Sequence, residues 1–326
     1  MSEIKISEVN YGKFGKCVQL TNGDIEVVVT VDMGPRIIRY ALVGGENVFC
    51  EAPDRVLDQK TGFRLLGGHR LWHAPEDLKR CYGPDNDPVK WQEIENGILV
   101  AGNPEPNTGM LKEMEISIEE EGTEVYVLHR ITNNNWWPIE FAAWGLSMMA
   151  PGGKEIIPLN QEMTAPLANN FLAFWPYVKL NDHRIWYGSE YITLTQDPSH
   201  KPPFKLGVKN NQGWAAYFNK GQLFVKQFFP EEGQKYPDGG MTYETYTTDF
   251  MLEMETLSPM YTVDPGDCVE HEEIWMIIDG VECPENNDDS IDAILGEYME
   301  YEDECCCDEC GCDDCDCDDC DEEEEE

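Results

Sequence analysis

Alternation between hydrophobic and polar positions is the main pattern along most of the chain. Residues 114–118 (MEISI) alternate Met and Ile with Glu and Ser, and residues 25–31 (IEVVVTV) form one apolar face at every second position. A period of two residues is typical of β-strands that bury one face. Similar runs occur at residues 37–43, 125–131, 191–195, 214–218, 223–229, 250–257 and 274–278. Clusters such as TNGD, EEGTE and NKGQ separate these runs and predict short turns.

Helical periodicity is confined to residues 290–301 (SIDAILGEYMEY), where Ile291, Ile294, Leu295 and Tyr298 share one face. No repeat of the length found in propellers or solenoids is visible. Long strands joined by short turns predict an all-β fold, a large antiparallel β-sandwich. The expected organisation is one β-domain, a linker with a short amphipathic helix, and a disordered tail: residues 1–283, 284–301 and 302–326.

Charge narrows the range of partners. The 326 residues carry a formal net charge of −41, and the rest of the chain stays strongly negative even without the acidic residues 302–326. Phosphate-rich surfaces require the opposite sign, so we expect no binding to nucleic acid or to anionic membranes. No apolar signal core or membrane-spanning stretch is visible, which favours a cytosolic protein. We expect it to be a monomer.

Cysteine usage divides the chain into two parts. The five cysteines at 17, 50, 81, 268 and 283 have no regular spacing, which suits reduced thiols in a cytosolic protein. The other eight crowd into the acidic tail as Cys305, Cys306, Cys307, Cys310, Cys312, Cys315, Cys317 and Cys320. Closely spaced thiolates bind zinc or another thiophilic ion, and eight could complete about two four-coordinate sites. The alternative is a solvated low-complexity tail without a specific ligand.

Residues 67–89 (GGHRLWHAPEDLKRCYGPDNDPV) gather His, Arg, Trp and carboxylate side chains without helical or strand periodicity. The segment therefore predicts a loop, either a polar connection or the lining of a site for a hydroxyl-rich ligand. His69 and His73 have the spacing of zinc ligands on a helix, with Glu76 or Asp77 as a third ligand. The neighbouring glycines and Pro75 argue against a helix there, so we favour the loop without zinc.

Two carboxylates lie on one face of a predicted strand at residues 250–257 (FMLEMETL). Strict alternation places Glu253 and Glu255 about 7 Å apart on the same face. In a partly dry cleft, desolvation and mutual repulsion would raise the pKa of at least one of them towards neutrality, as a general base requires. The alternative is a pair of solvated glutamates on an outward face.

Other polar or aromatic residues lie within apolar runs. His129 shares a face with Val125, Val127 and Ile131, which favours a core histidine. Lys205, Lys226 and His271 must each be paired or must contact a ligand, because an unpaired buried charge is costly. Trp72 and Trp144 are candidates for a platform on which the C–H face of a sugar stacks.

Five segments resemble the galactose mutarotase-like (aldose 1-epimerase-like) superfamily, and more closely one domain family within it. They are MGPRIIRYALVGGENVF, GGHRLWHAPE, HRITNNNWWPIEFAAWGLSMMAPGG, YETYTTDFMLEMETLSP and VDPGDCVEHEEIW, and the resemblance covers roughly residues 5–280. It implies a β-supersandwich whose concave face holds a carbohydrate. In the epimerases a Glu acts as base and a His as acid, while a second His and an Arg position the sugar. Neither the base nor the acid needs a cofactor or a metal.

The resemblance suggests roles for residues of this chain. LEMET lies where epimerases carry their base, which points to Glu255, with Glu253 as the alternative. GGHR lies near their first histidine, which makes His69 the candidate acid and Arg70 and Glu76 sugar contacts. Lys205, Lys226, His271, Trp72 and Trp144 belong to segments that resemble the family's cleft. The paired-histidine segment NHxHGG of the epimerases is absent, and His129 precedes the Asn run instead of following it.

Two classes of function follow. The first is an aldose 1-epimerase-type isomerase that uses Glu and His for acid–base chemistry on a small carbohydrate. The second is a carbohydrate-binding module without catalysis, which depends less on the missing histidine segment. A glycosidase or lyase comes third, because its carboxylate pair would look the same in sequence. A proton donor opposite Glu255 separates the first class from the second.

Overall fold

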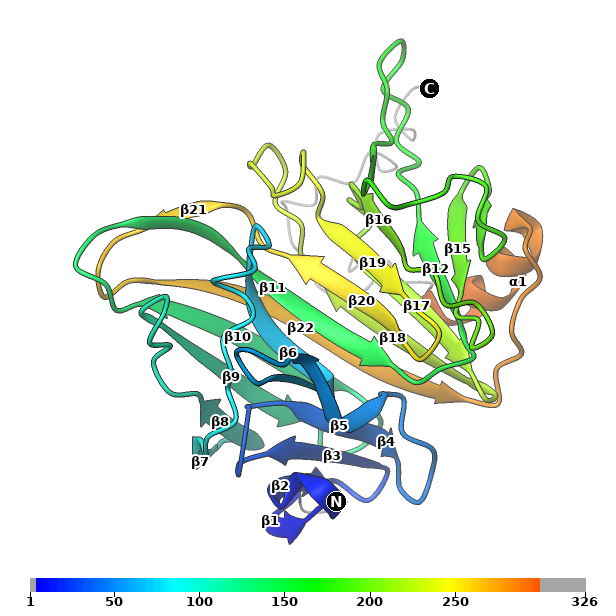
Figure 1. Cartoon of the computed structure of the whole chain (residues 1–326). Helices are drawn as coiled ribbons and strands as arrows, with labels where there is room; N and C mark the ends of the chain where they lie inside the picture. The colour runs from blue at the N-terminus through cyan, green and yellow to red at the C-terminus, as the bar shows by residue number, and fades with distance from the viewer. Residues whose placement is uncertain (1–3, 300–326) are drawn as a thin grey trace, which may run out of the picture.

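The computed structural model describes residues 4–299, and its strands form two antiparallel sheets that pack face to face (Figure 1). The first sheet has twelve strands, in the order β1-β2-β3-β4-β6-β11-β20-β19-β16-β13, with β5 paired to β6 and β21 to β11. Their bounds are β1 (Lys5–Asn10), β2 (Lys16–Thr21), β3 (Ile25–Thr30), β4 (Ile37–Leu42), β5 (Glu51–Asp58), β6 (Phe63–Ala74), β11 (Ile139–Met149), β13 (Leu172–Phe174), β16 (Phe204–Val208), β19 (Tyr243–Thr247), β20 (Leu252–Leu257) and β21 (Tyr261–Val263).

The second sheet has ten strands, in the order β14-β15-β12-β17-β18-β22-β10-β9-β8-β7. Their bounds are β7 (Lys90–Ile94), β8 (Gly97–Ala101), β9 (Met110–Ile118), β10 (Val125–Asn133), β12 (Lys154–Pro158), β14 (Ile185–Tyr187), β15 (Tyr191–Thr195), β17 (Trp214–Asn219), β18 (Gln222–Phe228) and β22 (Cys268–Asp279). A 3₁₀ turn, η1 (Gly12–Phe14), and one helix, α1 (Asp288–Met299), complete the described elements. The prediction of an all-β antiparallel sandwich is confirmed.

The main hydrophobic core lies between the two sheets. Strand β10 shows how the sequence builds it, because its side chains alternate strictly between buried and half-exposed. Val125 and Val127 of β10 join Val27 and Val29 of β3 in this core, and all four are fully buried. Burying one such side chain contributes about 1.5–3 kcal/mol. The period of two seen in the sequence is therefore the period of the packed face.

Helix α1 covers part of the outer face of the second sheet. Ile291 and Leu295 are one helical turn apart and both are buried against a cluster that includes Ile156 and Val225. The helix starts two residues before the predicted segment 290–301. It is not long and apolar enough to cross a membrane, and no other helix in the described part of the chain is either. The cysteine-rich tail and its predicted metal ligands lie outside the described residues.

The prediction of a loop across residues 67–89 is wrong for its first part, which belongs to β6. All residues of β6 except Arg64 are buried, so the strand lies between neighbours on both faces and shows no alternation. Gly67 and Gly68 lie within this strand. Their φ angles are +93° and +66°, and a Cβ on Gly68 would lie 2.2 Å from the carbonyl oxygen of Ile37. Glycine is required there because β6 changes pairing partner from β5 to β11.

Candidate functional site

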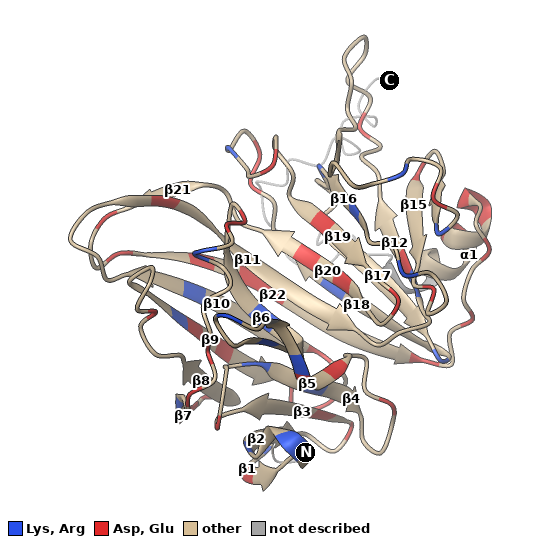
Figure 2. Ribbon diagram, viewed as in Figure 1, with Lys and Arg blue, Asp and Glu red and all other residues tan. Residues whose placement is uncertain are grey.

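Three neighbouring strands of the first sheet position the site. Leu146 of β11 is the register partner of Arg70 on β6 and of Glu255 on β20. Register partners point to the same face of a sheet, so Arg70 and Glu255 emerge on one face, on either side of Leu146 and away from the core. Figure 2 shows the acidic positions of β19 and β20 next to a basic position of β16 on this part of the sheet.

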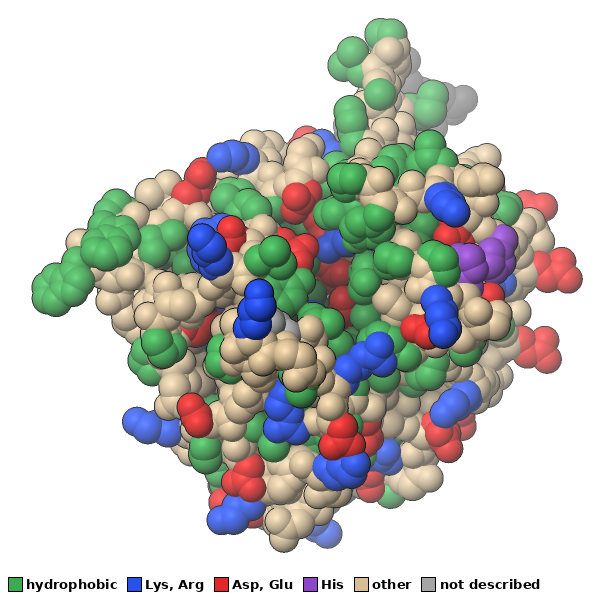
Figure 3. Space-filling view, in the orientation of Figure 1, with side chains coloured by type: hydrophobic (Ala, Val, Ile, Leu, Met, Phe, Trp, Pro, Cys, Tyr) green, Lys and Arg blue, Asp and Glu red, His purple; other side chains and the backbone are tan. Residues whose placement is uncertain are grey.

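A cavity of about 700 Å³ opens on this face, and we call it the Glu255 pocket. Figure 3 shows a hollow in the molecule with charged side chains at its base and hydrophobic side chains around it. Its aromatic walls are Trp72, Tyr82, Trp144, Trp175, Tyr177, Tyr246 and Phe250. Its charged lining residues are Arg55, Arg70, Glu76, Lys205, Glu253 and Glu255. Ligand sites commonly combine apolar walls with a few convergent polar groups, as here.

Glu255 is held by two donors at the base of the pocket. Its Oε2 lies 3.0 Å from Nζ of Lys205 and accepts a hydrogen bond of 3.1 Å from Nε1 of Trp144. Nζ of Lys205 also lies 2.7 Å from Oε2 of Glu244, the register partner of Glu255. The ammonium lies 4.8 Å from the ring centre of Trp144 and 4.7 Å from that of Trp175. Oε1 of Glu255 has no hydrogen-bond partner among the described residues and is available to a ligand.

Burial changes the proton affinity of this carboxylate pair. Loss of hydration raises the pKa of Glu255 to about 7, although the nearby Lys205 ammonium opposes the shift. Burial also raises the pKa of Glu244 well above its usual range. One ammonium therefore faces two carboxyl groups that do not both ionise readily. A carboxyl with a pKa near 7 can accept or release a proton at neutral pH, as acid–base catalysis requires.

The second ion pair of the pocket joins Arg70 and Glu253. Nη1 of Arg70 lies 2.8 Å from Oε1 of Glu253, and the guanidinium stacks over Trp72 with its carbon 4.3 Å from the ring centre. The contact lacks hydrogen-bond directionality, so Nε and Nη1 of Arg70 and Oε1 of Glu253 have no hydrogen-bond partner within the described chain. Buried polar atoms without hydrogen-bond partners favour a ligand that supplies hydroxyl groups to them. Glu76 lies nearby and accepts a 2.5 Å hydrogen bond from the Tyr82 hydroxyl.

The structure brings together most of the predicted site residues, but not all. The pocket is lined by Arg70, Trp72, Glu76, Trp144, Lys205, Glu253 and Glu255. The prediction that His69 faces Glu255 is wrong. His69 is adjacent to Arg70 on a strand, so its side chain points to the opposite face and is fully buried between the sheets. No histidine lines this pocket in the part of the chain that the structure describes.

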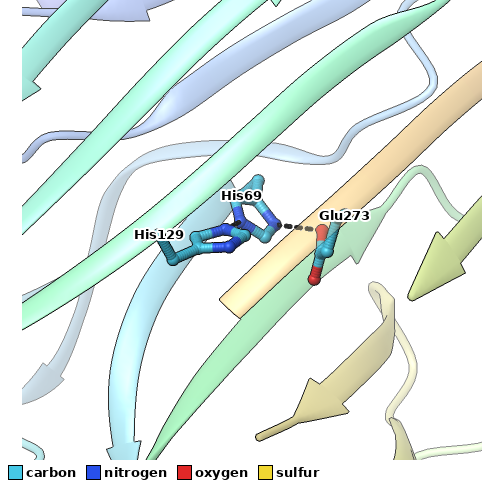
Figure 4. Close-up of side chains that lie close together, drawn as sticks. All are labelled: His69, His129 and Glu273. Carbon is cyan, nitrogen blue, oxygen red and sulfur yellow. Dashed lines mark hydrogen bonds and ion pairs between the residues drawn. The ribbon is translucent and has the colours of Figure 1, made fainter. Parts of the chain in front are cut away.

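His69 belongs to a buried polar network between the sheets (Figure 4). Its Nε2 lies 2.7 Å from Nε2 of His129, whose Nδ1 lies 2.7 Å from the carbonyl oxygen of His271. A carbonyl only accepts, so Nδ1 of His129 carries the proton and its Nε2 accepts from His69. Nδ1 of His69 then accepts from the Ser147 hydroxyl at 2.9 Å. Burial lowers the pKa of both histidines, which keeps them neutral, and the prediction of a core His129 is confirmed.

Glu273 anchors the other half of this network. It accepts hydrogen bonds from Nζ of Lys226 at 3.1 Å, from Nε1 of Trp275 at 2.7 Å and from the Thr256 hydroxyl. Nε2 of His271 lies 2.7 Å from the same hydroxyl oxygen. The prediction that Lys226 and His271 contact the ligand is wrong, because both point into the interior and do not line the pocket. Lys226 pairs with Glu273 and His271 with Thr256 inside the fold, which was the alternative to ligand contact.

The network does not need a metal, although ligand atoms of His69, His129 and Glu273 lie within 4.8 Å of one another. The lone pair on Nε2 of His129 accepts from His69, and the lone pair on Nδ1 of His69 accepts from Ser147. Neither imidazole therefore has a lone pair left for a metal. The zinc alternative based on His73 and Glu76 also fails. His73 is fully buried on the interior face with His69, whereas Glu76 lines the Glu255 pocket on the other face.

Sequence reasoning missed several residues of the site. Glu244 and Tyr246 alternate on one face of β19 as Glu253 and Glu255 do on β20, and this signal was present in YETYT. Trp175 and Tyr177 flank a proline between β13 and β14, where no periodicity marks a wall residue. Only the folded chain brings that segment over the sheet.

A second, larger cavity of about 880 Å³ shares Leu78 and Tyr82 with the Glu255 pocket. Its Arg36 pairs with Asp85 at 2.6 Å and its Lys112 pairs with Glu105 at 2.5 Å. Both are simple pairs of one cation with one carboxylate. The Glu255 pocket, with two carboxyls of raised pKa around one lysine, is the stronger candidate for chemistry.

No protein-family model and no curated protein match this sequence. Among solved structures, a candidate aldose 1-epimerase from Klebsiella pneumoniae aligns with 90% of this chain and 86% of its own, at 12% identity and a TM-score of 0.60. A galactose mutarotase-like protein from Lactobacillus casei aligns over 80% of this chain and 100% of its own, at 8% identity and a TM-score of 0.53.

A TPR-domain containing protein from Parabacteroides distasonis aligns with 82% of this chain at 13% identity and a TM-score of 0.56. The aligned region covers 49% of that protein, so this chain spans about half its length. Identities this low concern the fold alone. The two packed antiparallel sheets agree with these neighbours: the chain has the β-sandwich fold of the galactose mutarotase-like proteins.

Proposed function

We propose that the Glu255 pocket binds a small carbohydrate. The observation that carries the proposal is the combination of three tryptophans, Trp72, Trp144 and Trp175, with two ion pairs at the base. An indole packs against the C–H face of a sugar ring, while charged groups hydrogen-bond its hydroxyls. The fold neighbours described as epimerases and mutarotase-like proteins support the same class of ligand.

Titration of the full-length protein with a panel of aldoses and uronic acids tests this proposal, with binding followed by NMR and tryptophan fluorescence. Trp175→Ala removes one wall and should weaken binding about five- to tenfold, the equivalent of about 1–1.5 kcal/mol of stacking. Trp136→Ala is the matched control, because Trp136 is 93% exposed and does not line the pocket. Absence of binding to every sugar at millimolar concentration would reject the proposal.

A second candidate function is aldose 1-epimerase-type isomerisation, and the raised pKa of Glu255 favours it. Glu255 would take the proton of the anomeric hydroxyl as the C1–ring-oxygen bond breaks. The ring oxygen would receive a proton, the aldehyde would rotate, and the reverse steps would close the other anomer. The chemistry is redox-neutral and returns both protons.

With His69 on the far face, the proton for the ring oxygen must come from another group. We assign this role to Tyr246, which lines the pocket and is the register partner of Glu253. Burial raises the pKa of Tyr246 to about 12, so it keeps its proton at neutral pH and can donate a hydrogen bond. Exchange spectroscopy between anomers, with and without protein, tests the reaction. Exchange that Tyr246→Phe leaves unchanged would remove Tyr246 from this role.

A further inference from the structure

Four metal-ligating side chains meet on two turns outside the Glu255 pocket. Asp182 ends the turn that its N–H closes on Lys179 O, and His183 follows it. Asp197 and His200 belong to the turn closed by the bond from His200 N to Asp197 O. The bond from Thr195 N to Arg184 O, 2.9 Å, holds the two segments together. The imidazole rings lie 4.8 Å apart and nearly perpendicular. Figure 3 shows surface histidines, in purple, beside acidic and basic side chains.

Hydrogen bonding selects one tautomer of the neutral His183 imidazole. Its Nε2 lies 3.1 Å from Oδ2 of Asp197, whose Oδ1 accepts bonds from Ser199 N at 2.8 Å and Ser199 Oγ at 2.7 Å. A carboxylate accepts, so Nε2 carries the proton and Nδ1 keeps its lone pair. A histidine oriented by a carboxylate in this way is the usual arrangement of a metal ligand.

The free lone pair faces a gap of the size that an ion requires. Nδ1 of His183 lies 4.0 Å from Oδ1 of Asp182, and Nε2 of His200 lies 3.8 Å from Oδ2 of the same carboxylate. These distances are too long for hydrogen bonds. Two bonds of about 2.0–2.2 Å to one tetrahedral ion place ligand atoms about 3.4 Å apart. Small rotations of the exposed His183 imidazole and the half-buried His200 imidazole would therefore close the site.

Asp182 is oriented by Arg184, which donates from Nε to Oδ1 at 3.0 Å and from Nη2 to Oδ2 at 2.9 Å. Oδ1 also accepts from the backbone N of Arg184 at 3.0 Å, so Oδ2 is the oxygen that retains a lone pair for an ion. The guanidinium opposes a cation, but two carboxylates surround the site, and the strongly acidic chain attracts cations as a whole. Imidazole with carboxylate is a ligand set that suits zinc-class ions.

We propose that Asp182, His183 and His200 bind a divalent zinc-class ion, with water completing the coordination and Asp197 orienting His183. The site ties together two segments that reach the Glu255 pocket. Trp175 and Tyr177 precede Asp182 along the chain, and Pro203 and Lys205 follow His200. Metal binding therefore braces one wall of the pocket, and it does so whatever ligand the pocket accepts.

Zinc titration of the full-length reduced protein, followed by NMR of its imidazole resonances, tests the proposal. The chain has six histidines, and the buried His69, His73, His129 and His271 serve as internal controls. Zinc is added beyond the capacity of the tail thiols. We expect the resonances of His183 and His200 to shift in saturable fashion while the other four stay in place.

Variants test which residues hold the zinc ion. Asp197→Asn should weaken zinc binding at this site about 10–100-fold, because the oriented imidazole is lost, whereas the exposed Asp264→Asn should leave it unchanged. The double variant His183→Asn/His200→Asn should take up one zinc ion fewer than the wild type. Unmoved His183 and His200 resonances, or equal zinc stoichiometry in the double variant, would overturn the proposal. Neither outcome depends on sugar binding.

Discussion

Nζ of Lys205 lies 3.0 Å from Oε2 of Glu255 at the base of an aromatic pocket. The contact fixes one carboxylate oxygen of a residue that lines the cavity. Burial, and to a lesser degree the nearby Glu253 carboxylate, raise the pKa of this group, while the Lys205 ammonium limits the rise. The result is a buried carboxyl of fixed orientation that titrates near neutral pH.

Glu255→Gln should abolish anomer exchange and change sugar affinity only a few-fold. The amide keeps the size of the side chain and an oxygen that accepts from Lys205 and Trp144, but it cannot take a proton. Exchange spectroscopy and binding titrations on the same sample separate the two effects. Glu76→Gln is the control and should retain exchange, because Glu76 lines the pocket without the role of base. Exchange at the wild-type rate in Glu255→Gln would remove Glu255 from the mechanism.

Glu155→Gln should change how stability depends on pH. Burial raises the pKa of Glu155 to about 8 from an ordinary value of 4.5. Between these values the unfolded chain has released the proton that the folded chain keeps, so this group makes the free energy of unfolding fall as pH rises from 4.5 to about 8. Each unit of the shift corresponds to about 1.4 kcal/mol.

Glutamine cannot ionise, so the variant should gain stability relative to the wild type as pH rises through that window. Urea unfolding at pH values spanning the window measures the effect. The exposed Glu162→Gln provides the control, and its stability curve should run parallel to that of the wild type. If the Glu155→Gln curve is also parallel, Glu155 does not titrate as described.

Thr256→Val should destabilise the protein by about 1–3 kcal/mol without altering any pocket side chain. The change removes a donor to Glu273 and the partner of His271 Nε2, which leaves buried polar groups unsatisfied. Urea unfolding measures the loss. Thr262→Val on β21 is the matched control, because Thr262 is exposed and should change stability by less than about 0.5 kcal/mol. Equal stability of the two variants would argue against the network.

Two Gly→Ala changes should act in opposite directions. A Cβ on Gly145 would lie 2.4 Å from Oε1 of Glu273 and 3.2 Å from the Thr256 hydroxyl, so Gly145→Ala should destabilise by about 1–3 kcal/mol. A Cβ on Gly296 in α1 meets nothing within 4 Å, and Gly296→Ala should stabilise by up to about 1 kcal/mol. Thermal unfolding compares them, and a neutral Gly145→Ala would show that Glu273 can move away.

The acidic tail should bind zinc independently of the β-sandwich. Its eight thiols could complete about two four-coordinate sites under reducing conditions. Truncation after Tyr301 should remove this thiol-dependent uptake, measured by metal analysis after dialysis, and leave sugar binding unchanged. If the full-length reduced protein holds no more zinc than the truncated one, the tail is only a charged solubiliser.

The sequence was informative where one face of a strand is buried. Alternation at residues 250–257 correctly placed Glu253 and Glu255 on one face, and alternation in β10 correctly placed His129 in the core. It failed at β6, which is buried on both faces and therefore shows no alternation. Treating that segment as a loop grouped His69 with Arg70, although neighbouring residues of a strand face opposite ways.

The lysines show a second limit. Lys205 and Lys226 both lie in short apolar strands, and each is paired with glutamate. Lys205 reaches the pocket because it lies on the outer face of the first sheet, whereas Lys226 lies on the inner face of the second sheet and pairs with Glu273 between the sheets. Which sheet a strand joins depends on pairing between distant segments, and local patterns do not contain that information.

The pocket has a base carried by strands and a wall carried by the segment between β13 and β14. Arg70, Glu253 and Glu255 lie on β6 and β20, which both pair with β11 and have the buried histidine–glutamate network behind them. Trp175 and Tyr177 lie outside these strands. For protein engineering, this separates two design variables. Residues of the wall segment can be exchanged without opening the core, so the lining of the pocket and the stability of the fold can be altered one at a time.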